Sequence, residues 1–375
     1  MPRMVVLVID SGGVGALPDA GAYGDTSEAN TLGNVAARAG GLNLPTLERL
    51  GLGDVTKILG VRAVEHPEAA VARLQERSRG KDTITGHWEM AGIITTVPFP
   101  TYPHGFPPEV IERFTAIAGK PPLGNKTASG TEIINELGDE HVKTGRPILY
   151  TSADSVFQVA THEDVVPLAT LYDWCERVRA MLVAPHNVNR VIARPFTGTS
   201  GKYTRTPNRR DYALEPPPSV LDDLSARGVP VHAVGKICDI YCGHGITTSV
   251  RVVDNDDAMN QTALLLGRLE YGLIFTNLND FDSKYGHRRD ARGYARALER
   301  LDVRLAELLP QLRAGDGLIV TADHGCDPTA PGSDHTREFV PFIEYGTAAG
   351  AVLGAIGGLD YVGKRVRVSL SGGAR

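Results

Sequence analysis

The sequence is short of cysteine, of net charge and of long apolar runs, and each shortage excludes a class of protein. Four cysteines in 375 residues are too few for a disulfide framework. Cys238 and Cys242 have no second thiol pair to complete a zinc site, so we interpret them as buried structural cysteines. A net charge of −5 gives no reason to expect nucleic acid or an anionic membrane as partner. No apolar run approaches the roughly 20 residues that span a bilayer.

The first residues also lack the features of a secretory signal. Met1 to Met4 lead at once into an apolar run of five residues, which ends at Asp10. A signal peptide needs a longer apolar region and a cleavage site of small residues. Together with the absence of paired thiols, this predicts a cytoplasmic protein.

Short β-branched runs recur at wide spacing, with helical patterns between several of them. Residues 293–312 carry apolar side chains at helical spacing, and residues 44–51 have proline in the first turn and glycine at the end. Strands that alternate with helices predict an α/β fold with a mostly parallel sheet. The predicted strands are residues 5–9, 148–151, 191–193, 229–234, 273–276, 318–321 and 340–344.

The middle of the chain differs in composition from its two ends. Proline-rich segments at residues 97–103 and 215–218 bracket a glycine- and threonine-containing loop and an arginine-rich stretch. The residues that suit a metal lie on both sides of this insert and not within it. We therefore predict a core domain of residues 1–97 and 218–375, with a smaller α/β cap inserted at residues 98–217.

Carboxylates and imidazoles follow the ends of several predicted strands. Ligands bind beyond the carboxyl ends of the strands in such sheets, so one edge could gather these side chains. Oxygen and nitrogen ligands without thiolate suit Mn²⁺, Zn²⁺ or Fe²⁺. A lone aspartate such as Asp10 is more often a turn cap. Only the recurrence of carboxylates and imidazoles at several strand ends favours a dinuclear metal site. The candidate ligands are Asp10, Asp282, His287, Asp323, His324 and His335.

A third element, residues 80–89, places Thr83 near the expected start of a helix. An isolated threonine there is normally an N-cap and nothing more. If Thr83 sat beside a bound metal, its hydroxyl would lose its proton more easily and could attack phosphorus. His87 and Trp88 in the same segment are expected to pack the helix behind it.

Several blocks together resemble one family. They are residues 10–15 (DSGGVG), 81–89 (KDTITGHWE), 128–132 (ASGTE), 150–158 (YTSADSVFQ), 205–212 (RTPNRRDY), 280–289 (DFDSKYGHRR) and 321–329 (TADHGCDPT). Their order and content are similar to the phosphopentomutase family, metal-dependent members of the alkaline phosphatase superfamily. The resemblance implies an alkaline-phosphatase-like core and the interconversion of ribose or deoxyribose 1-phosphate and 5-phosphate.

The resemblance also implies residue roles. Thr83 would be phosphorylated, with Asp10, Asp323 and His324 around the nearer metal and Asp282, His287 and His335 around the other. Ser152 and Asp154 match the segment that meets the sugar. Arg190, Arg205 and Lys236 match positions that bind the distal phosphate. Arg194, which is close to Arg190 in the sequence, remains an alternative candidate for that role.

The implied cofactors are two Mn²⁺ ions, with Mg²⁺, Zn²⁺ or Co²⁺ as substitutes. A sugar bisphosphate, glucose 1,6-bisphosphate or ribose 1,5-bisphosphate, would act as activator. The expected partners are small sugar phosphates of nucleoside salvage, with no nucleic acid or membrane, and the protein would be a monomer or a small homo-oligomer.

The sequence departs from the family pattern at Gly12, Thr127 and Asn279, none of which is a proposed ligand. A phosphatase or phosphodiesterase on the same core is the nearest rival. A cofactor-independent phosphoglycerate mutase would carry serine in place of Thr83 and a different cap. No Cys-x-Pro-x-Arg motif supports a sulfatase. A metal-binding scaffold without activity is the rival outside enzymes.

Overall fold

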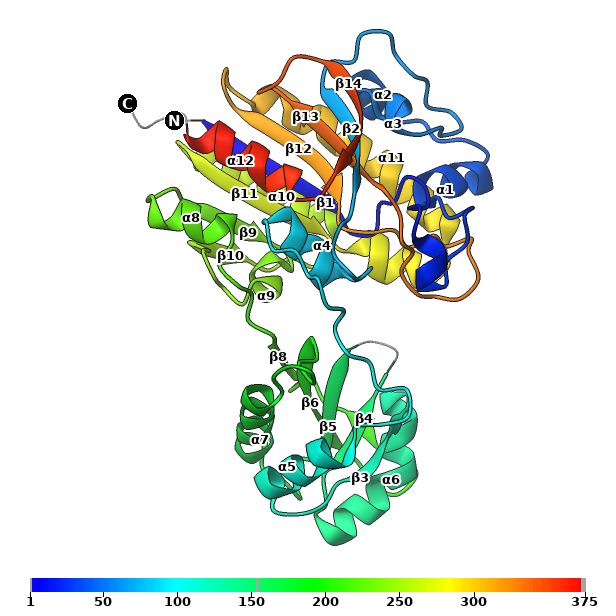
Figure 1. The fold of residues 1–375 in the computed structure, drawn as a ribbon, viewed down its shortest axis with the longest axis vertical. Helices are drawn as coiled ribbons and strands as arrows, with labels where there is room; N and C mark the ends of the chain where they lie inside the picture. The colour runs from blue at the N-terminus through cyan, green and yellow to red at the C-terminus, as the bar shows by residue number, and fades with distance from the viewer. Residues whose placement is uncertain (1, 153–154, 372–375) are drawn as a thin grey trace. The chain divides into compact units, whose positions relative to one another are not determined.

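The computed structural model describes residues 2–152 and 155–371, which form two compact units (Figure 1). Unit 1 comprises Met1–Pro98 and Pro216–Arg375, and unit 2 comprises Phe99–Glu215. Strands alternate with helices in both, so the predicted α/β class is confirmed. No helix within the described residues is long and apolar enough to cross a bilayer.

Unit 1 is built on an eight-stranded sheet. Every neighbouring pair is parallel except the two that β13 makes, which confirms the mostly parallel sheet. The strands, in spatial order, are β10 (Thr248–Val250), β9 (Val231–Val234), β11 (Gly272–Leu278), β1 (Arg3–Ile9), β12 (Gly317–Ala322), β13 (Val340–Tyr345), β2 (Ala70–Gln75) and β14 (Ala351–Gly357).

The three central strands β11, β1 and β12 are buried along their whole length. A parallel strand covered on both faces has no polar side to alternate, so it reads as a continuous apolar run. This is why residues 5–9, 273–276 and 318–321 were recognisable as strands. Each large aliphatic side chain buried here contributes about 1.5–3 kcal/mol to folding.

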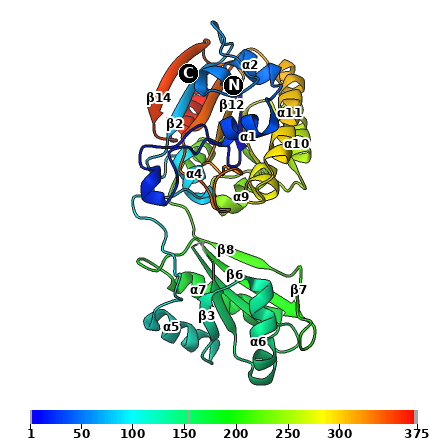
Figure 2. The same ribbon diagram turned by 90° about the vertical axis from the view of Figure 1, so that its right-hand side faces the viewer.

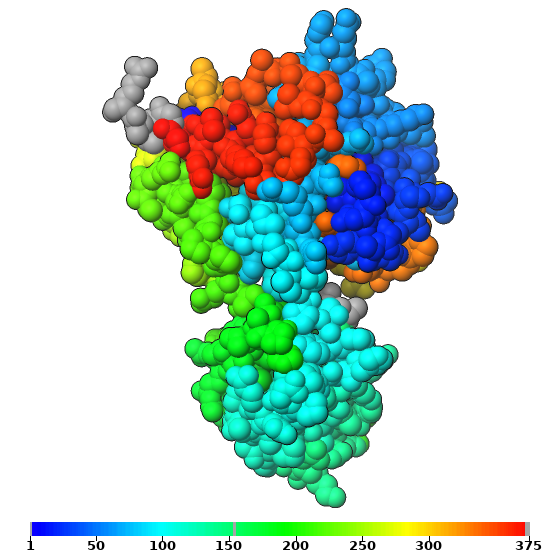
Figure 3. Space-filling view, viewed as in Figure 1, coloured from blue at the N-terminus to red at the C-terminus, as the bar shows by residue number. Residues whose placement is uncertain are grey.

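Helices cover both faces of this sheet. On one face α4, α8 and α12 pack on Val6, Leu273 and Phe275, and Figure 3 shows α12 (red) covering this side of unit 1. On the other face lie α10 and α11, and Thr262 of α10 bonds Thr276 of β11 at 2.7 Å. The helices are α1 (Thr31–Ala39), α2 (Pro45–Leu50), α3 (Leu52–Val55), α4 (Thr83–Met90), α8 (Val220–Ala226), α9 (Ile237–Ile240), α10 (Asn255–Arg268), α11 (Ala291–Leu308) and α12 (Tyr361–Ser371), with short 3₁₀ turns at Ala20–Tyr23 and Leu309–Gln311.

Unit 2 has its own six-stranded sheet and two apolar clusters, one on each face. One cluster joins α5 and α7 to Phe157 and Val191, and the other joins α6 to Ile148 and Phe196. Figure 2 shows α5 and α7 on one side of the strands and α6 on the other. Its elements are β3 (Leu123–Thr127), β4 (Ile148–Thr151), β5 (Val156–His162), β6 (Arg190–Thr197), β7 (Thr204–Arg205), β8 (Arg210–Ala213), α5 (Pro108–Ala118), α6 (Gly130–Thr144) and α7 (Leu168–Met181).

The helices expected from the sequence are confirmed with shifted ends. The pattern at residues 293–312 corresponds to α11, which begins two residues earlier and ends in a 3₁₀ turn. The pattern at residues 44–51 corresponds to α2, which begins at Pro45. Gly51 follows it with a φ of 104°, a conformation that favours glycine.

Candidate metal centre

The carboxyl ends of β11, β1 and β12 lie side by side and carry the candidate ligands. Ile9 is paired with Leu278 on one side and with Ala322 on the other, so Asp10 leaves the sheet between the two other segments. The ligand atoms fall into two triads, and within each triad they lie within 4.8 Å of one another. The first triad is Asp10, Asp323 and His324, and the second is Asp282, His287 and His335.

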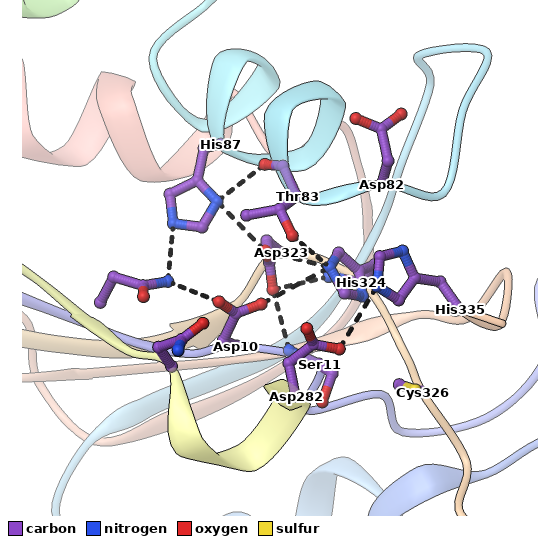
Figure 4. Close-up of polar contacts among 12 residues, drawn as sticks. Asp10, Ser11, Asp82, Thr83, His87, Asp282, Asp323, His324, Cys326 and His335 are labelled. Atoms are coloured by element: carbon purple, nitrogen blue, oxygen red, sulfur yellow. Dashed lines mark hydrogen bonds and ion pairs between the residues drawn. The ribbon is translucent and has the colours of Figure 1, made fainter. Parts of the chain in front are cut away.

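The first triad is fully enclosed, with Asp10 and Asp323 showing no exposed surface (Figure 4). The Nε2 atom of His324 lies 3.2 Å from Asp323 Oδ2 and 3.6 Å from Asp10 Oδ1. Its Nδ1 atom is 3.0 Å from the carbonyl oxygen of Gly325, which can only accept, so Nδ1 carries a hydrogen. In the neutral ring, Nε2 therefore faces two carboxylates with a lone pair, an arrangement that a proton or a metal ion must bridge.

The turn after β1 fixes Asp10 and Asp323 relative to each other. Ser11 adopts a φ of 79°, and its N–H donates to Asp323 Oδ1 at 3.0 Å. Gly12 follows, where an added Cβ would lie 2.9 Å from Ile9 Cγ2 and 3.1 Å from Ala322 Cβ. In this chain the tight turn against β12 therefore accounts for Gly12, one of the three departures from the family pattern.

The second triad depends on a π-helix, Phe281–Gly286, directly after β11. Asp282 and His287 are five residues apart, and the N–H of His287 donates to the carbonyl oxygen of Asp282 at 3.0 Å. An α-helix would turn residues five apart to different faces, whereas one π-turn returns them to the same face. His287 Nε2 lies 3.3 Å from Asp282 Oδ2, and His335 Nε2 lies 3.3 Å from Asp282 Oδ1.

The second triad also has its imidazoles oriented for binding. His287 Nδ1 donates to the carbonyl oxygen of Ser333 at 2.6 Å, which leaves Nε2 without a hydrogen when the ring is neutral. That Nε2 lies only 3.1 Å from Nε2 of His335. The rings of His335 and His324 stack at 4.0 Å, so the two triads adjoin.

The electrostatics of the triads call for positive charge. Among the described residues, Asp10 Oδ1, Asp282 Oδ1 and Asp323 Oδ2 are buried and accept no hydrogen bond. Burial and repulsion from Asp323 raise the pKa of Asp10 to about 7. Burial lowers the pKa of His324, but Asp323 and Asp10 outweigh it and raise that pKa to about 10. Buried carboxylates of this kind are stable when paired or bound to metal, so the donor set fits two divalent cations.

Thr83 begins α4 and faces the first triad. Asp82 is the N-cap of this helix and accepts from the N–H groups of Ile84 and Thr85 at 3.1 Å each. The Thr83 hydroxyl is therefore not used as the cap, and it lies 3.2 Å from His324 Nε2 (Figure 4).

Two residues that lie at the centre were not among the site candidates from the sequence. His87 is buried behind Thr83, as expected, and in addition its Nδ1 atom lies 3.1 Å from Asp323 Oδ2. Asn277 near the end of β11 donates to Asp10 Oδ2 at 3.0 Å. A usable signal was present for His87, which stands four residues after Thr83 and thus on the same helix face.

The substrate candidates of unit 2 are spread along its sheet. Ser152 follows β4, and Asp154 lies outside the described residues. Arg190 begins β6, whereas Arg205 of β7 pairs with Phe196 near the other end of β6. Arg194 lies between them along β6 and donates to Gln158 at 3.1 Å. Along β6, Arg194 is therefore nearer than Arg190 to Phe196, the residue that pairs with Arg205.

Lys236 belongs to unit 1 and follows β9. Its Nζ atom lies 3.7 Å from Asp10 Oδ2, and its side chain is 42% exposed. The structure thus places this lysine beside the first triad.

Comparison with known proteins gives a consistent set of relatives. The model of the metalloenzyme superfamily matches residues 2–367. The chain is 55% identical over 347 residues to the phosphopentomutase of Clostridium novyi (strain NT), covering 92% of this chain and 89% of that protein. It is 50% identical over 369 residues to the phosphopentomutase of Clostridium kluyveri (strain NBRC 12016), covering 98% and 95%.

A solved structure, that of the PH0037 protein from Pyrococcus horikoshii, has a similar fold. Its TM-score is 0.51 at 13% identity, and the match covers 100% of this chain and 98% of that one. At this identity the likeness extends to the fold alone.

Proposed function

Since the chain belongs to the phosphopentomutase family of the metalloenzyme superfamily, we propose that it interconverts the 1-phosphates and 5-phosphates of ribose and deoxyribose through a phosphorylated Thr83. The role of Thr83 rests on one observation. Its hydroxyl lies 3.2 Å from Nε2 of His324, which belongs to a buried cluster of carboxylates and an imidazole.

Asp10, Asp323 and His324 would hold one divalent cation, and Asp282, His287 and His335 the other. Two cations, when bound, supply positive charge that stabilises the transferring phosphoryl group and favours loss of the Thr83 proton. Mn²⁺ is the proposed metal, with Mg²⁺, Zn²⁺ or Co²⁺ as substitutes. The buried oxygens Asp10 Oδ1, Asp282 Oδ1 and Asp323 Oδ2, which accept no hydrogen bond from the described residues and face imidazole nitrogens, support this assignment.

In the proposed cycle the phosphoryl group leaves Thr83 Oγ1 for the free hydroxyl of a bound sugar monophosphate. That hydroxyl gives up its proton, Thr83 Oγ1 takes one up as it leaves, and the product is a sugar bisphosphate. After the sugar reorients, Thr83 Oγ1 loses its proton and attacks the other phosphate. The sugar oxygen leaves and takes up a proton, and Thr83 is phosphorylated again. The dipole of α4 favours negative charge on Thr83, which is the first residue of that helix.

The inserted segment, residues 98–217, is proposed as a substrate-binding cap. Ser152, Asp154, Arg190 and Arg205 would contact the sugar and its distal phosphate there. Lys236, which lies beside the first triad in unit 1, is proposed as a further substrate-binding residue. Arginine suits this role because its planar fork binds a phosphate bidentately. In unit 2 the hydroxyl of Tyr150 and the Nε of Arg190 are buried without a hydrogen-bond partner among the described residues, which supports a polar ligand at this sheet.

Replacing Thr83 tests the proposal directly. Thr83→Ala should abolish both mutase turnover and the phosphate that mass spectrometry finds on the protein after incubation with Mn²⁺ and glucose 1,6-bisphosphate. Thr83→Ser keeps a hydroxyl and should retain both in part. Full turnover by Thr83→Ala would refute the role of this residue.

Product analysis with ribose 5-phosphate separates the proposed function from its rivals. Ribose 1-phosphate indicates a mutase, and free phosphate indicates a phosphatase on the same core. No turnover with Mn²⁺ and a bisphosphate primer indicates a metal-binding scaffold.

A further inference from the structure

One imidazole connects the helix of Thr83 to both carboxylates of the first triad. His87 is fully buried, and its Nδ1 atom lies 2.9 Å from the carbonyl oxygen of Thr83 and 3.1 Å from Asp323 Oδ2. On the other side of the ring, Nε2 lies 3.4 Å from Asn277 Nδ2. Asn277 Nδ2 lies in turn 3.0 Å from Asp10 Oδ2. Figure 4 shows the contacts of His87 with Thr83 and with Asp323 as dashed lines.

The chemistry of these groups assigns each hydrogen. The carbonyl oxygen of Thr83 can only accept, so Nδ1 of His87 carries a hydrogen, which also faces the carboxylate of Asp323. Nε2 is then left with a lone pair and accepts from the amide of Asn277. The second hydrogen of that amide is donated to Asp10 Oδ2. A reversed amide would place its carbonyl oxygen against the Asp10 carboxylate, so this orientation is the favourable one.

We propose that His87 and Asn277 are positioning residues of the metal centre. Asn277 donates to Asp10 Oδ2, and the Nδ1–H of His87 lies against Asp323 Oδ2 as an electrostatic contact. Asp10 Oδ1 is left buried without a hydrogen bond from any described residue and directed towards His324. Through His87 the same link ties α4, and with it Thr83, to the two carboxylates. The inference rests on the proposed function, because that function assigns a cation to the first triad. Outer contacts of this kind orient metal ligands.

A purely structural role for His87 makes a different prediction. Its ring lies 6.2 Å from that of Phe275, and its backbone carbonyl accepts from the Tyr241 hydroxyl. A phenylalanine would preserve this ring packing and the backbone bond while removing both nitrogens. An asparagine is smaller but can place an amide nitrogen near the position of Nδ1.

The test is a calorimetric titration of metal-stripped protein with Mn²⁺. His87→Phe should weaken binding at one of two sites about 10- to 100-fold, and His87→Asn should recover part of that loss. Asn277→Leu, which keeps the volume and removes the amide, should weaken the same site. The control is Trp88→Phe, which removes a 3.2 Å bond from the same helix to Ile240 and should leave Mn²⁺ binding unchanged.

A second readout follows Thr83 itself. At saturating Mn²⁺, the fraction of Thr83 phosphorylated by glucose 1,6-bisphosphate should fall in His87→Phe and be partly restored in His87→Asn. Wild-type Mn²⁺ affinity in both His87→Phe and Asn277→Leu would overturn the inference, as would an equal loss in Trp88→Phe. If His87→Phe does not fold, Asn277→Leu alone decides. Failure of the wild-type chain to bind two Mn²⁺ ions would instead refute the proposed function and this inference with it.

Discussion

The backbone of Gly86 lies directly against that of Asp323: a Cβ atom added to Gly86 would be 2.3 Å from the Asp323 carbonyl oxygen. Gly86 is three residues into the helix that begins at Thr83, so this contact sets how closely α4 approaches the end of β12. A side chain larger than hydrogen cannot be accommodated without moving one of the two elements.

Gly86→Ala is therefore expected to push Thr83 away from the first triad. A displacement of about 1 Å lowers turnover roughly 100-fold, and the overpacking costs about 1–3 kcal/mol of unfolding free energy. Turnover and chemical denaturation measure the two effects. Gly267→Ala is the matched control, because that helical glycine has no atom within 4 Å of the added Cβ. Wild-type turnover in Gly86→Ala would show that α4 can shift freely.

Removal of metal should destabilise the protein as well as inactivate it. Each cation present at 100 times its dissociation constant contributes about 2.7 kcal/mol to unfolding free energy, so chelation should lower the melting temperature and Mn²⁺ should restore it. Asp282→Asn should reduce the bound metal from two ions to one in elemental analysis. Asp164→Asn, at a side chain that is 89% exposed, should retain both. Two ions in Asp282→Asn would remove this residue from the ligand set.

The ion pair of Arg3 and Asp316 should make stability depend on acid pH. Burial raises the pKa of Asp316, but hydrogen bonds from Arg3 and Arg313 outweigh it and hold that pKa below its ordinary value of 3.8. The folded state thus binds the proton less tightly than the unfolded state. The stabilisation is present above about pH 4 and is lost as the pH falls through the folded pKa.

Asp316→Asn tests this dependence. At neutral pH it should cost about 3–5 kcal/mol, because Arg3 would be left buried without its carboxylate. The difference from wild type should shrink below pH 4 in denaturation curves. Glu68→Gln, in the exposed pair with Arg49, should have little effect at any pH. A difference that does not change with pH would contradict the linkage.

Arg337 should hold in place residues 76–80, the segment that leads to Thr83. This buried side chain donates to Glu76 at 2.5 Å, to the carbonyl oxygen of Ser78 at 2.9 Å and to that of Gly80 at 2.7 Å. Arg337→Met should cost about 3–5 kcal/mol by leaving Glu76 unpaired, and it should lower phosphorylation of Thr83.

Arg73→Met is the control for Arg337→Met, since both guanidinium groups stack on an aromatic ring at 4.7 Å but Arg73 is exposed. Arg73→Met should lower the free energy of unfolding by no more than about 1 kcal/mol. Equal effects of the two changes would attribute the result to stacking alone.

The sequence was most informative where local chemistry decides structure. The apolar runs at residues 5–9, 273–276 and 318–321 became the three buried central strands, because a strand covered on both faces needs apolar side chains throughout. The polar residues that follow such runs were therefore recognisable as site candidates. The antiparallel direction of β13 was not predictable, since an apolar run carries no information on its direction in a sheet.

Other features required the folded chain. The spacing of five between Asp282 and His287 is uninformative until a π-helix turns both to one side. The separation of Arg190 from Arg205 along β6 depends on strand register, which is set by pairing with distant residues. The bridge from His87 through Asn277 to Asp10 joins three elements that are far apart in the sequence.

The amino-acid sequence alone thus determined the α/β class, the family and the set of candidate metal ligands, because these follow from side-chain type and short-range pattern. The tertiary structure alone decided which of these side chains adjoin and which partners orient them. The physical reason is that a hydrogen bond or a metal site is defined to within fractions of an ångström, and such distances arise only when turns, register and packing bring remote segments together.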